Sequence, residues 1–526
     1  MALPTPVSAK ALNRTLQRYD PHLRDYLVSG FTFGFDLGIQ GDIAIQPAHT
    51  CNHASALANP DIAKSKIDRE VVLGRIGGPV PLQSQQQVVI SPLALIPKRE
   101  PGKFRLIHDL SFPKGESINS TIPREFTTVH YDSIDNVISL VKRCGERCLM
   151  SKSDLSEAFR QIPVSPAQYR YLGFMWDDQI YFDKCLPFGC ASSCQIFSAL
   201  SDALGWVMIN EHHAAGISYI LDDFFFVSPA NSDKCQQDLL NFIRMCGVIG
   251  LPIKEEKTQH ASTDIVIYGI RINSCEMTAS LPPDKLSKAR TLLHGLKQKR
   301  KTTLRQLQAV IGFLNFACSV VLPGRAFLRR MVDLTRGIQK PHHRIRLNKE
   351  ARADMCMWLH FLDFHNGKSC FLSDEWEHSD SLKLFTDASG VLGYAAILGD
   401  KWFNGKWPVA MQCMHITIKE LFPIVVAMEY WGLALANRRI VFMCDNAAVV
   451  DIVNKISSKD SLIMTLVRRL VLTTLKYNIL FRAKHVPGFT NVVADRLSRF
   501  QFQAAFQFAP WLKQEPEQIP QDLIAI

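Results

Sequence analysis

SYILDDFFFVSP, residues 218–229, places two adjacent carboxylates, Asp222 and Asp223, inside a run of Tyr, Ile, Leu, Phe and Val that otherwise has the pattern of a buried strand. An ionised carboxylate in an apolar interior without a partner costs several kcal/mol. No Lys or Arg lies within the stretch. The compensating charge therefore has to come from elsewhere in the chain or from a bound metal ion.

A third carboxylate, Asp154, ends the strand-like stretch CLMSKSD at 148–154. We interpret 218–229 as a strand, a turn and a strand, because a tight turn aims adjacent side chains toward one site. Three carboxylates could hold two divalent cations, which together activate a 3′-hydroxyl and stabilise a pyrophosphate leaving group. A solvated hairpin turn is the simpler interpretation of an Asp–Asp pair taken alone. The apolar flanks and the further motifs favour the metal site.

Length and composition bound the class of protein. At 526 residues the chain exceeds one core, and a prior of about 150 residues per domain suggests roughly three or four units. The formal charge of +11 favours a polyanionic partner. The 14 Cys show no zinc-site spacing, and the N-terminus has no apolar signal region. These features predict an intracellular protein of cytoplasm or nucleus, neither secreted nor membrane-bound.

The chain resembles the reverse transcriptase family in several motifs. DLSEAFRQIPV, LPFG followed by SSCQIF, and YILDD are similar to its catalytic and template-contacting segments. The resemblance implies that Asp154, Asp222 and Asp223 are metal ligands, with Leu221 a modest departure from the family's usual pattern. It also implies that Phe159 is the aromatic gate that excludes a ribose 2′-hydroxyl, although this side chain could equally belong to the core.

The same resemblance supplies candidate substrate contacts. KFRLIHDLS is similar to the strand that grips the triphosphate, with Arg105 the better candidate and Lys103 the weaker, since Arg suits bidentate phosphate recognition. Lys257 matches a lysine near the polymerase site, with Lys254 as a competitor. YGIRIN at 268–273 resembles the primer-grip hairpin. The nucleotide pocket is expected to include Phe188, Gly189, Gln195 and Phe197.

A second set of acids lies in the C-terminal third: Asp387, Glu420, Asp445 and Asp495. After residue 380 the expected order is three strands, helix, strand, two helices, strand and helix, an α/β layered pattern. Four carboxylates suffice for a two-metal hydrolytic site. Helix capping by Asp445-Asn446 and a turn at Asp387 are the alternatives.

The order of these acids and of the leading strands resembles ribonuclease H. The resemblance implies catalysis by Asp387, Glu420, Asp445 and Asp495, each of them also a metal ligand, and a mobile histidine at His485 that helps product release. RYDPHLRDYLVSGFTFGFDLGIQG, VLGRIGGPV and HVPGFTNVVADRLSR are similar to DIRS-type, tyrosine-recombinase retrotransposons. Such elements also encode a recombinase, which this chain lacks and with which it could associate.

The expected fold class is multidomain α/β and α+β: a right-hand polymerase of fingers, palm and thumb, then a ribonuclease H-like α/β domain. The expected domains are an N-terminal extension of unknown role at 1–80, fingers and palm at 81–280, a thumb-like helical region at 281–340, a connection at 341–380, the ribonuclease H-like domain at 381–500 and a flexible tail at 501–526.

The predicted function is RNA-directed DNA polymerisation with cleavage of RNA in RNA/DNA hybrids. The implied cofactors are two Mg²⁺ ions per active site, with Mn²⁺ as an alternative. The implied partners are an RNA template, a DNA primer, the RNA/DNA hybrid and dNTPs. Two other functions stay open: a domesticated, non-catalytic nucleic-acid-binding protein, and a nuclease whose polymerase half only binds the hybrid.

Overall fold

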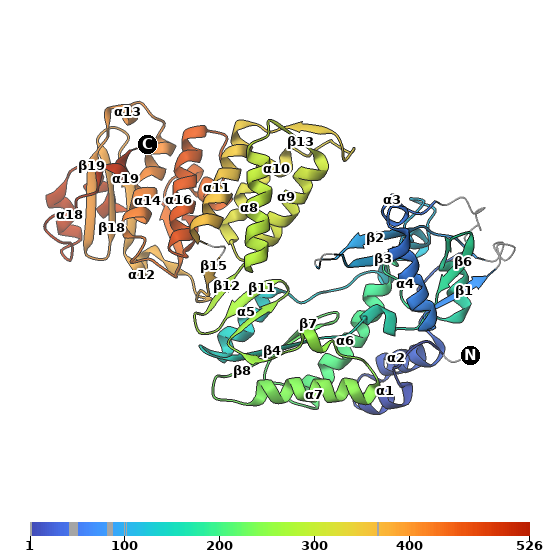
Figure 1. The fold of residues 1–526 in the computed structure, drawn as a ribbon. Coiled ribbons are helices and arrows are strands. Elements are labelled where there is room, and N and C mark those ends of the chain that lie inside the picture. Colours follow the sequence, from blue (N-terminus) through green and yellow to red (C-terminus); the bar gives the residue numbers. More distant parts are fainter. Residues whose placement is uncertain are drawn as a thin grey trace. The chain divides into compact units, whose positions relative to one another are not determined.

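The computed structural model describes residues 3–41, 51–80, 88–98, 100, 102–365 and 368–525. The chain divides into two compact units, Met1–Tyr268 and Gly269–Ile526 (Figure 1). Within the described residues, no helix has both the length and the apolar character needed to cross a membrane.

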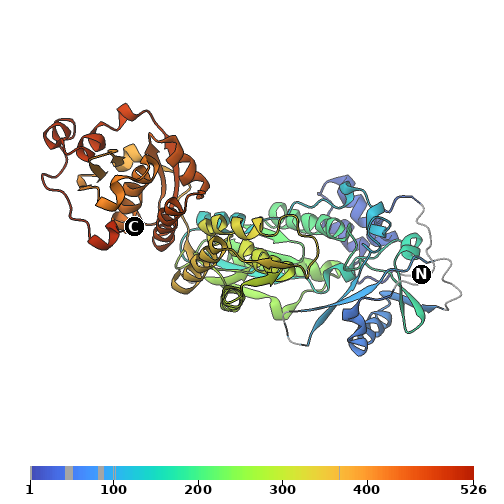
Figure 2. The same cartoon turned by 90° about the horizontal axis from the view of Figure 1, so that it is seen from above.

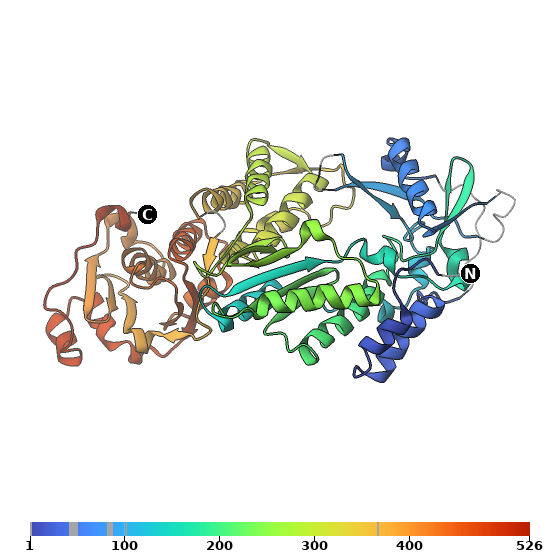
Figure 3. The same ribbon diagram turned by 60° about the horizontal axis from the view of Figure 1, so that its bottom comes forward.

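The centre of the first unit is a four-stranded sheet in the order β7-β8-β4-β9. Its strand β8 is buried on both faces, since Phe224, Phe225, Phe226 and Val227 have no exposed surface. Helices pack against the sheet (Figure 3), and the Phe224 and Phe242 ring centroids lie 4.3 Å apart. The elements are β4 (Leu149–Asp154), β7 (Ile217–Ile220), β8 (Asp223–Ser228), β9 (Gln259–Ser262), α5 (Ile134–Cys144), α6 (Ser193–Asn210) and α7 (Lys234–Ile249).

Two smaller sheets complete this unit, and each contains a hairpin. β2 pairs with β3, and β5 pairs with β6 around Asp177 and Asp178, whose φ values of 49° and 55° fit a tight hairpin turn. Helix α4 buries Ala63 and Ile67 against this region. The elements are α3 (Ala54–Leu57), α4 (Pro60–Val72), β1 (Ile76–Val80), β2 (Leu93–Pro97), β3 (Phe104–His108), β5 (Gly173–Trp176) and β6 (Gln179–Asp183).

The N-terminal residues belong to the main core of the first unit. Helices α1 (Ala9–Thr15) and α2 (Pro21–Phe33) are followed by an extended stretch that bridges to Val164 at Phe35. The side chains of Leu12, Leu16, Leu27, Phe31 and Phe35 are buried in the same hydrophobic cluster as those of α6 and α7. Sequence periodicity gave this segment no role, and the packing shows that it stabilises the unit that carries the first carboxylate cluster.

The second unit begins with a hairpin and a helical region. Tyr268 and Gly269, with φ values of 48° and 77°, separate the last strand of the first unit, β10 (Asp264–Ile267), from β11. The expected helices follow. The elements are β11 (Ile270–Asn273), β12 (Thr278–Ser280), α8 (Pro283–Lys297), β13 (Lys301–Thr303), α9 (Leu304–Ala317), α10 (Arg329–Asp333), β14 (Arg344–Arg346), α11 (Lys349–His365) and β15 (Lys368–Cys370).

The C-terminal part is the layered α/β arrangement expected after residue 380 (Figure 2). One sheet is antiparallel, β17-β18-β19, and the other is parallel, β16-β20-β21. The predicted order of strands and helices is found, with one further short helix, α13, before α14. The elements are β16 (Glu377–His378), α12 (Ser379–Leu382), β17 (Leu384–Ala388), β18 (Gly393–Leu398), β19 (Lys401–Lys406), α13 (Val409–Gln412), α14 (Ile416–Trp431), β20 (Arg439–Cys444), α15 (Ala447–Lys455), α16 (Ser461–Lys476), β21 (Leu480–His485) and α17 (Val492–Ser498).

The tail expected to be flexible at 501–526 instead packs on this part. It contains α18 (Phe502–Phe508) and α19 (Gln521–Ile524). Ala505, Ala509 and Leu512 are buried in a cluster with Trp402, whose indole N–H donates to the carbonyl oxygen of Lys513 at 2.8 Å. The prediction was wrong because the Pro and Gln composition concealed a few apolar residues that bury surface together.

Candidate active sites

The first carboxylate cluster is built by strand register. Asp154 at the end of β4 lies directly opposite Asp223 at the start of β8. Asp222 occupies the two-residue turn between β7 and β8, and its carbonyl oxygen accepts a hydrogen bond from the Leu155 N–H at 3.0 Å. The turn needs Leu221 at φ 53°, and the buried Ser201 hydroxyl donates to its carbonyl oxygen at 2.8 Å. All three acids therefore stand at one end of the sheet.

Burial and mutual repulsion perturb these acids. Burial, then the charges of Asp154 and Asp222, raises the pKa of Asp223 to about 6. Burial and Asp154 also raise the pKa of Asp222. The Lys257 ammonium lies 2.6 Å from a carboxylate oxygen of Asp154, which is only 4% exposed. The compensating cation thus comes from a lysine distant in sequence, and Lys257 rather than Lys254 reaches the site.

The donor set suits a hard divalent cation, because carboxylate oxygens are the ligands that Mg²⁺ prefers. In the part of the chain that the structure describes, however, no three His, Cys, Asp or Glu side chains are grouped closely enough to hold a metal ion. In this arrangement the Asp154 carboxylate accepts a hydrogen bond from the Lys257 ammonium. A bound cation would have to draw the carboxylates together and would relieve the repulsion that raises their pKa values.

An aromatic cluster lies beside Arg105, which is close enough for its positive charge to act on the Asp222 carboxylate. Phe159, in the short helical turn Ala158–Gln161, lies 5.2 Å from the Phe188 ring and 5.6 Å from the buried Phe197 ring. The Arg105 guanidinium stacks over Phe188 at 4.6 Å. Lys103 instead pairs with Glu100 on the surface. The structure therefore brings together Phe159, Phe188 and Arg105.

The two remaining predicted pocket residues have other contacts. Gly189 has φ 129°, and a Cβ there would lie 2.0 Å from the His108 carbonyl oxygen, so the backbone requires glycine. The Gln195 amide donates to the carbonyl oxygen of Glu125 at 2.6 Å. Gln195 lines a separate cavity, described below.

Sequence reasoning missed a group of cations beside Arg105. The pKa of Lys98 is lowered by burial and then by the positive charges of Lys66, Arg105 and Lys254. Mutually repelling cations from separate segments favour an anionic ligand. Nothing in the sequence distinguishes Lys66 on α4 or Lys98 at the end of β2 from solvated surface lysines, so only the fold identifies them.

The second carboxylate cluster also shares one site. Burial, then the charges of Asp387, Asp445 and Asp495, raises the pKa of Glu420 to about 9. Burial raises the pKa of Asp387 to about 6, although the Ser498 hydroxyl donates to its carboxylate at 2.6 Å. These acids come from β17, α14, the end of β20 and α17. The topology has therefore brought together four acids that are far apart in sequence.

The structural alternatives hold for the neighbours of two of these acids: Asn446, of the pair Asp445-Asn446, is the helix cap, and Ser389 makes the turn contacts after Asp387. Asn446 caps α15, accepting from the N–H groups of Ala448 at 3.0 Å and Val449 at 3.2 Å. The Ser389 hydroxyl accepts hydrogen bonds from the backbone N–H groups of Val391 and Leu392, in the turn after β17. The exposed His485 ring contacts the carbonyl oxygen of Asp445 at 3.0 Å. Sequence reasoning missed two partners of these acids. Ser498, on α17, donates a hydrogen bond to Asp387, and Arg499, just after α17, pairs with Asp495 at 2.7 Å.

Glu420→Gln should stabilise the metal-free protein at alkaline pH. Because folding raises the pKa of Glu420 from 4.5 to about 9, its contribution to stability is complete below the lower value and is lost as the pH rises toward the higher one. Each pH unit of this interval costs at most about 1.4 kcal/mol. Glutamine does not ionise, so in EDTA the variant should unfold roughly several °C higher than wild type near pH 9.

Thermal unfolding of the full chain across this pH range measures the effect. The variant and wild type should agree at acid pH, and Glu515→Gln, a change on the exposed surface, should follow wild type throughout. Curves for wild type and Glu420→Gln that run parallel at every pH would contradict a carboxyl group whose pKa is raised by burial and by the neighbouring acids.

Comparison with known proteins agrees with this architecture. The structure of the foamy viral protease-reverse transcriptase dRH in complex with double-stranded DNA matches with a TM-score of 0.50 and 16% identity, over 85% of this chain and 72% of that one. The fold is therefore polymerase-like. Residues 96–304 match the family model described as reverse transcriptase (RNA-dependent DNA polymerase). That part of the chain is therefore similar to reverse transcriptase domains.

Curated relatives are viral polyproteins. An enzymatic polyprotein of Cassava vein mosaic virus is 21% identical over 377 residues, covering 70% of this chain and 55% of the relative. The Gag-Pro-Pol polyprotein of bovine leukemia virus is 25% identical over 297 residues, covering 53% of this chain and 19% of the relative. The chain thus spans about half or less of the length of these relatives.

Proposed function

We propose that this chain is an RNA-directed DNA polymerase that also cleaves the RNA strand of RNA/DNA hybrids. The observation that carries the proposal is the register that sets Asp154 opposite Asp223, with Asp222 in the adjoining turn. The match of residues 96–304 to the reverse transcriptase family supports it. So does the fold shared with a protein solved in complex with double-stranded DNA.

In this proposal each residue has a distinct task. Asp154, Asp222 and Asp223 hold two Mg²⁺ ions, which supply activation of the primer 3′-hydroxyl and stabilisation of the leaving pyrophosphate. Arg105 and the neighbouring lysines bind the triphosphate, and Phe159 with Phe188 forms the wall against the sugar. The Lys257 ammonium, which pairs with Asp154 in this structure, would be the proton donor to the departing phosphates.

The second cluster supports a ribonuclease H activity. Asp387, Glu420, Asp445 and Asp495 hold two further Mg²⁺ ions, whose charge lowers the raised pKa values of Glu420 and Asp387. His485, exposed beside Asp445, assists product release. The assignments of residues 81–280 to fingers and palm, 281–340 to thumb, 341–380 to a connection and 381–500 to the nuclease are part of this proposal.

The finer identity we propose is an intracellular retrotransposon protein of the DIRS type, acting with a recombinase encoded elsewhere. The resemblance of RYDPHLRDYLVSGFTFGFDLGIQG, VLGRIGGPV and HVPGFTNVVADRLSR to DIRS-type elements supports this identity. The alternative of a non-catalytic binder has one observation in its favour, the Lys257–Asp154 pair in place of a preassembled metal cage among the described residues. All seven acids being present favours catalysis.

The test uses one substrate that reports both activities. A 5′-labelled RNA template carries a DNA primer with a different label, and the full chain is added with dNTPs and Mg²⁺. We expect a lengthened primer and a shortened RNA in the same reaction. Shortened RNA alone would identify a nuclease, and tight binding with neither product would identify the non-catalytic binder.

Phe159→Ala should weaken the discrimination against ribonucleotides. Removing the ring that packs on Phe188 opens the space where a 2′-hydroxyl would clash, so the ratio of dNTP to rNTP incorporation efficiency should fall by about 10-fold or more. Single-turnover incorporation of each nucleotide measures the ratio. Phe33→Ala, at a 69% exposed ring on α2, is the control. An unchanged ratio with both nucleotides slowed equally would place Phe159 in the core only.

A further inference from the structure

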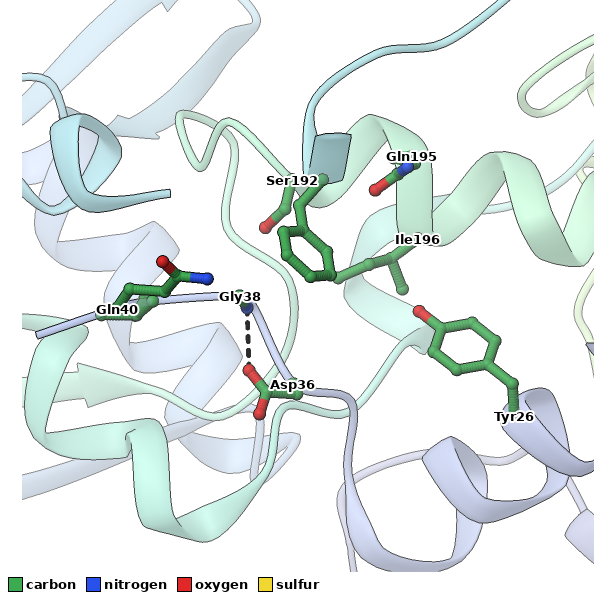
Figure 4. A pocket seen from close by; sticks show the side chains of 9 residues that line it. Tyr26, Asp36, Gly38, Gln40, Ser192, Gln195 and Ile196 are labelled. Carbon is green, nitrogen blue, oxygen red and sulfur yellow. Dashed lines mark hydrogen bonds between the residues drawn. The ribbon is translucent and has the colours of Figure 1, made fainter. Parts of the chain in front are cut away.

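A cavity of about 340 Å³ lies in the first unit, apart from both carboxylate clusters (Figure 4). Its walls come from three segments: α2 with the stretch that follows it, the short helical turn Arg124–Phe126, and the first turns of α6. Part of the N-terminal segment, whose sequence suggested no role, therefore forms a concave surface together with the polymerase fold.

The lining combines exposed aromatic rings with neutral hydrogen-bonding groups. Tyr26 is 41% exposed and Phe126 is 39% exposed. Ser192, Gln40 and Gln195 add a hydroxyl and two amides, and the amide N–H of Gln195 is already directed to Glu125. Burial raises the pKa of Tyr26 to about 12, so its hydroxyl stays neutral at physiological pH.

Charge excludes a phosphate as the occupant. Among the described residues that line the cavity there is no lysine or arginine, and the one ionisable acid is Asp36. Its carboxylate accepts hydrogen bonds from the Gly38 N–H at 2.8 Å and from the Gln168 amide. An uncharged, planar group that stacks on a ring and hydrogen-bonds to amides fits this surface, and a nucleobase has these properties.

The cavity is held open by well-defined contacts. The Leu37 N–H donates to the Gln168 side chain at 2.7 Å, and the Phe35 N–H donates to the Pro163 carbonyl oxygen at 2.9 Å. Gly38 has φ 74°, and a Cβ there would lie 2.9 Å from the Phe126 ring, so glycine lets the chain pass directly against this ring. The wall is therefore organised without a ligand.

The cavity is linked to the polymerase site by one helix. Ile196 lines the cavity, and the next residue on α6, Phe197, contacts Phe159 at 5.6 Å. The cavity and the aromatic cluster therefore meet the same end of α6.

We propose that this cavity binds one unpaired base of the single-stranded template ahead of the polymerase site. The base stacks on Tyr26 and Phe126 and hydrogen-bonds to Gln40 and Gln195, while its sugar and phosphate stay outside. The inference rests on the proposed polymerase function, because it needs a template strand that runs beyond the paired primer.

The experiment measures the affinity of the full chain, without dNTPs, for a primer paired to RNA templates with a short 5′ overhang. An abasic site is placed at each overhang position in turn. Wild type should lose about 5- to 10-fold in affinity at one position, since stacking of a base on an aromatic ring has this magnitude. Tyr26→Ala and Gln40→Ala should bind the intact and abasic templates almost equally, with a blunt duplex bound as by wild type.

Phe33→Ala, on the same helix but outside the cavity, should retain the abasic penalty. Because Gln40 is exposed and packs in no core, its variant keeps the test valid if Tyr26→Ala folds poorly. A penalty at no position, or one that survives both variants, would overturn the inference. If an abasic position lowers the affinity but the chain does not extend the primer when dNTPs are added, the proposed polymerase function would be refuted and base binding in the cavity would stand.

Discussion

Asp223→Asn should abolish primer extension and leave hybrid cleavage intact. Asparagine keeps the shape of the side chain opposite Asp154 but removes an anionic oxygen that a divalent cation requires. We expect extension to fall about 10³-fold or more, the scale for removing a group that acts directly on the transition state. Cleavage should persist because its four acids belong to the other compact unit.

Unfolding would not explain such a loss. Folding raises the pKa of Asp223 from 3.8 to about 6, so stability of the metal-free protein is lost as the pH rises through this interval, and a neutral asparagine relieves the repulsion. Asp177→Asn is the matched control, since Asp177 lies in an exposed turn at φ 49°, a conformation that asparagine tolerates. If Asp223→Asn removed both activities from a folded protein, the assignment of two separate sites would be wrong.

Asp445→Asn should produce the opposite pattern. Asp445 directly follows β20 and contributes to the charge that raises the pKa of Glu420, so its loss removes a ligand of the hydrolytic site. Cleavage of a labelled hybrid should fall about 10³-fold or more, with primer extension unchanged.

The control for this variant is Asp451→Asn on the neighbouring helix α15, where the exposed side chain pairs with Lys455. Residual cleavage by Asp445→Asn close to that of the control would mean that Asp445 caps or packs rather than catalyses. A simultaneous loss of extension would indicate one site serving both reactions.

Local pattern was sufficient for the elements that carry the acids. The apolar run around Asp222 and Asp223 and the strand-like stretch ending at Asp154 were both recognisable from the sequence. Once the sheet forms, its register alone brings the three acids together. The order of strands and helices after residue 380 was equally predictable, because each element has a clear period and turn residues separate them.

Long-range pairing was not predictable. The sequence offered Lys254 and Lys257 as equal candidates, and the fold separates them, since Lys254 pairs with Glu256 while Lys257 reaches Asp154. The same limit applies to Gln195, whose partner is a carbonyl group far away in sequence. Composition also concealed the packing of the C-terminal residues against Trp402. In each case the deciding contact joins segments that have no local signal for one another.

The most direct measurement is primer extension on a defined RNA template with dNTPs and Mg²⁺, comparing the purified chain with its Asp222→Ala/Asp223→Ala variant. Both proteins are first shown to bind the primer–template with the same salt dependence, which separates binding from chemistry. We predict extension by wild type and none by the variant. Equal extension by both proteins, or none by wild type despite tight binding, would contradict polymerisation at this hairpin.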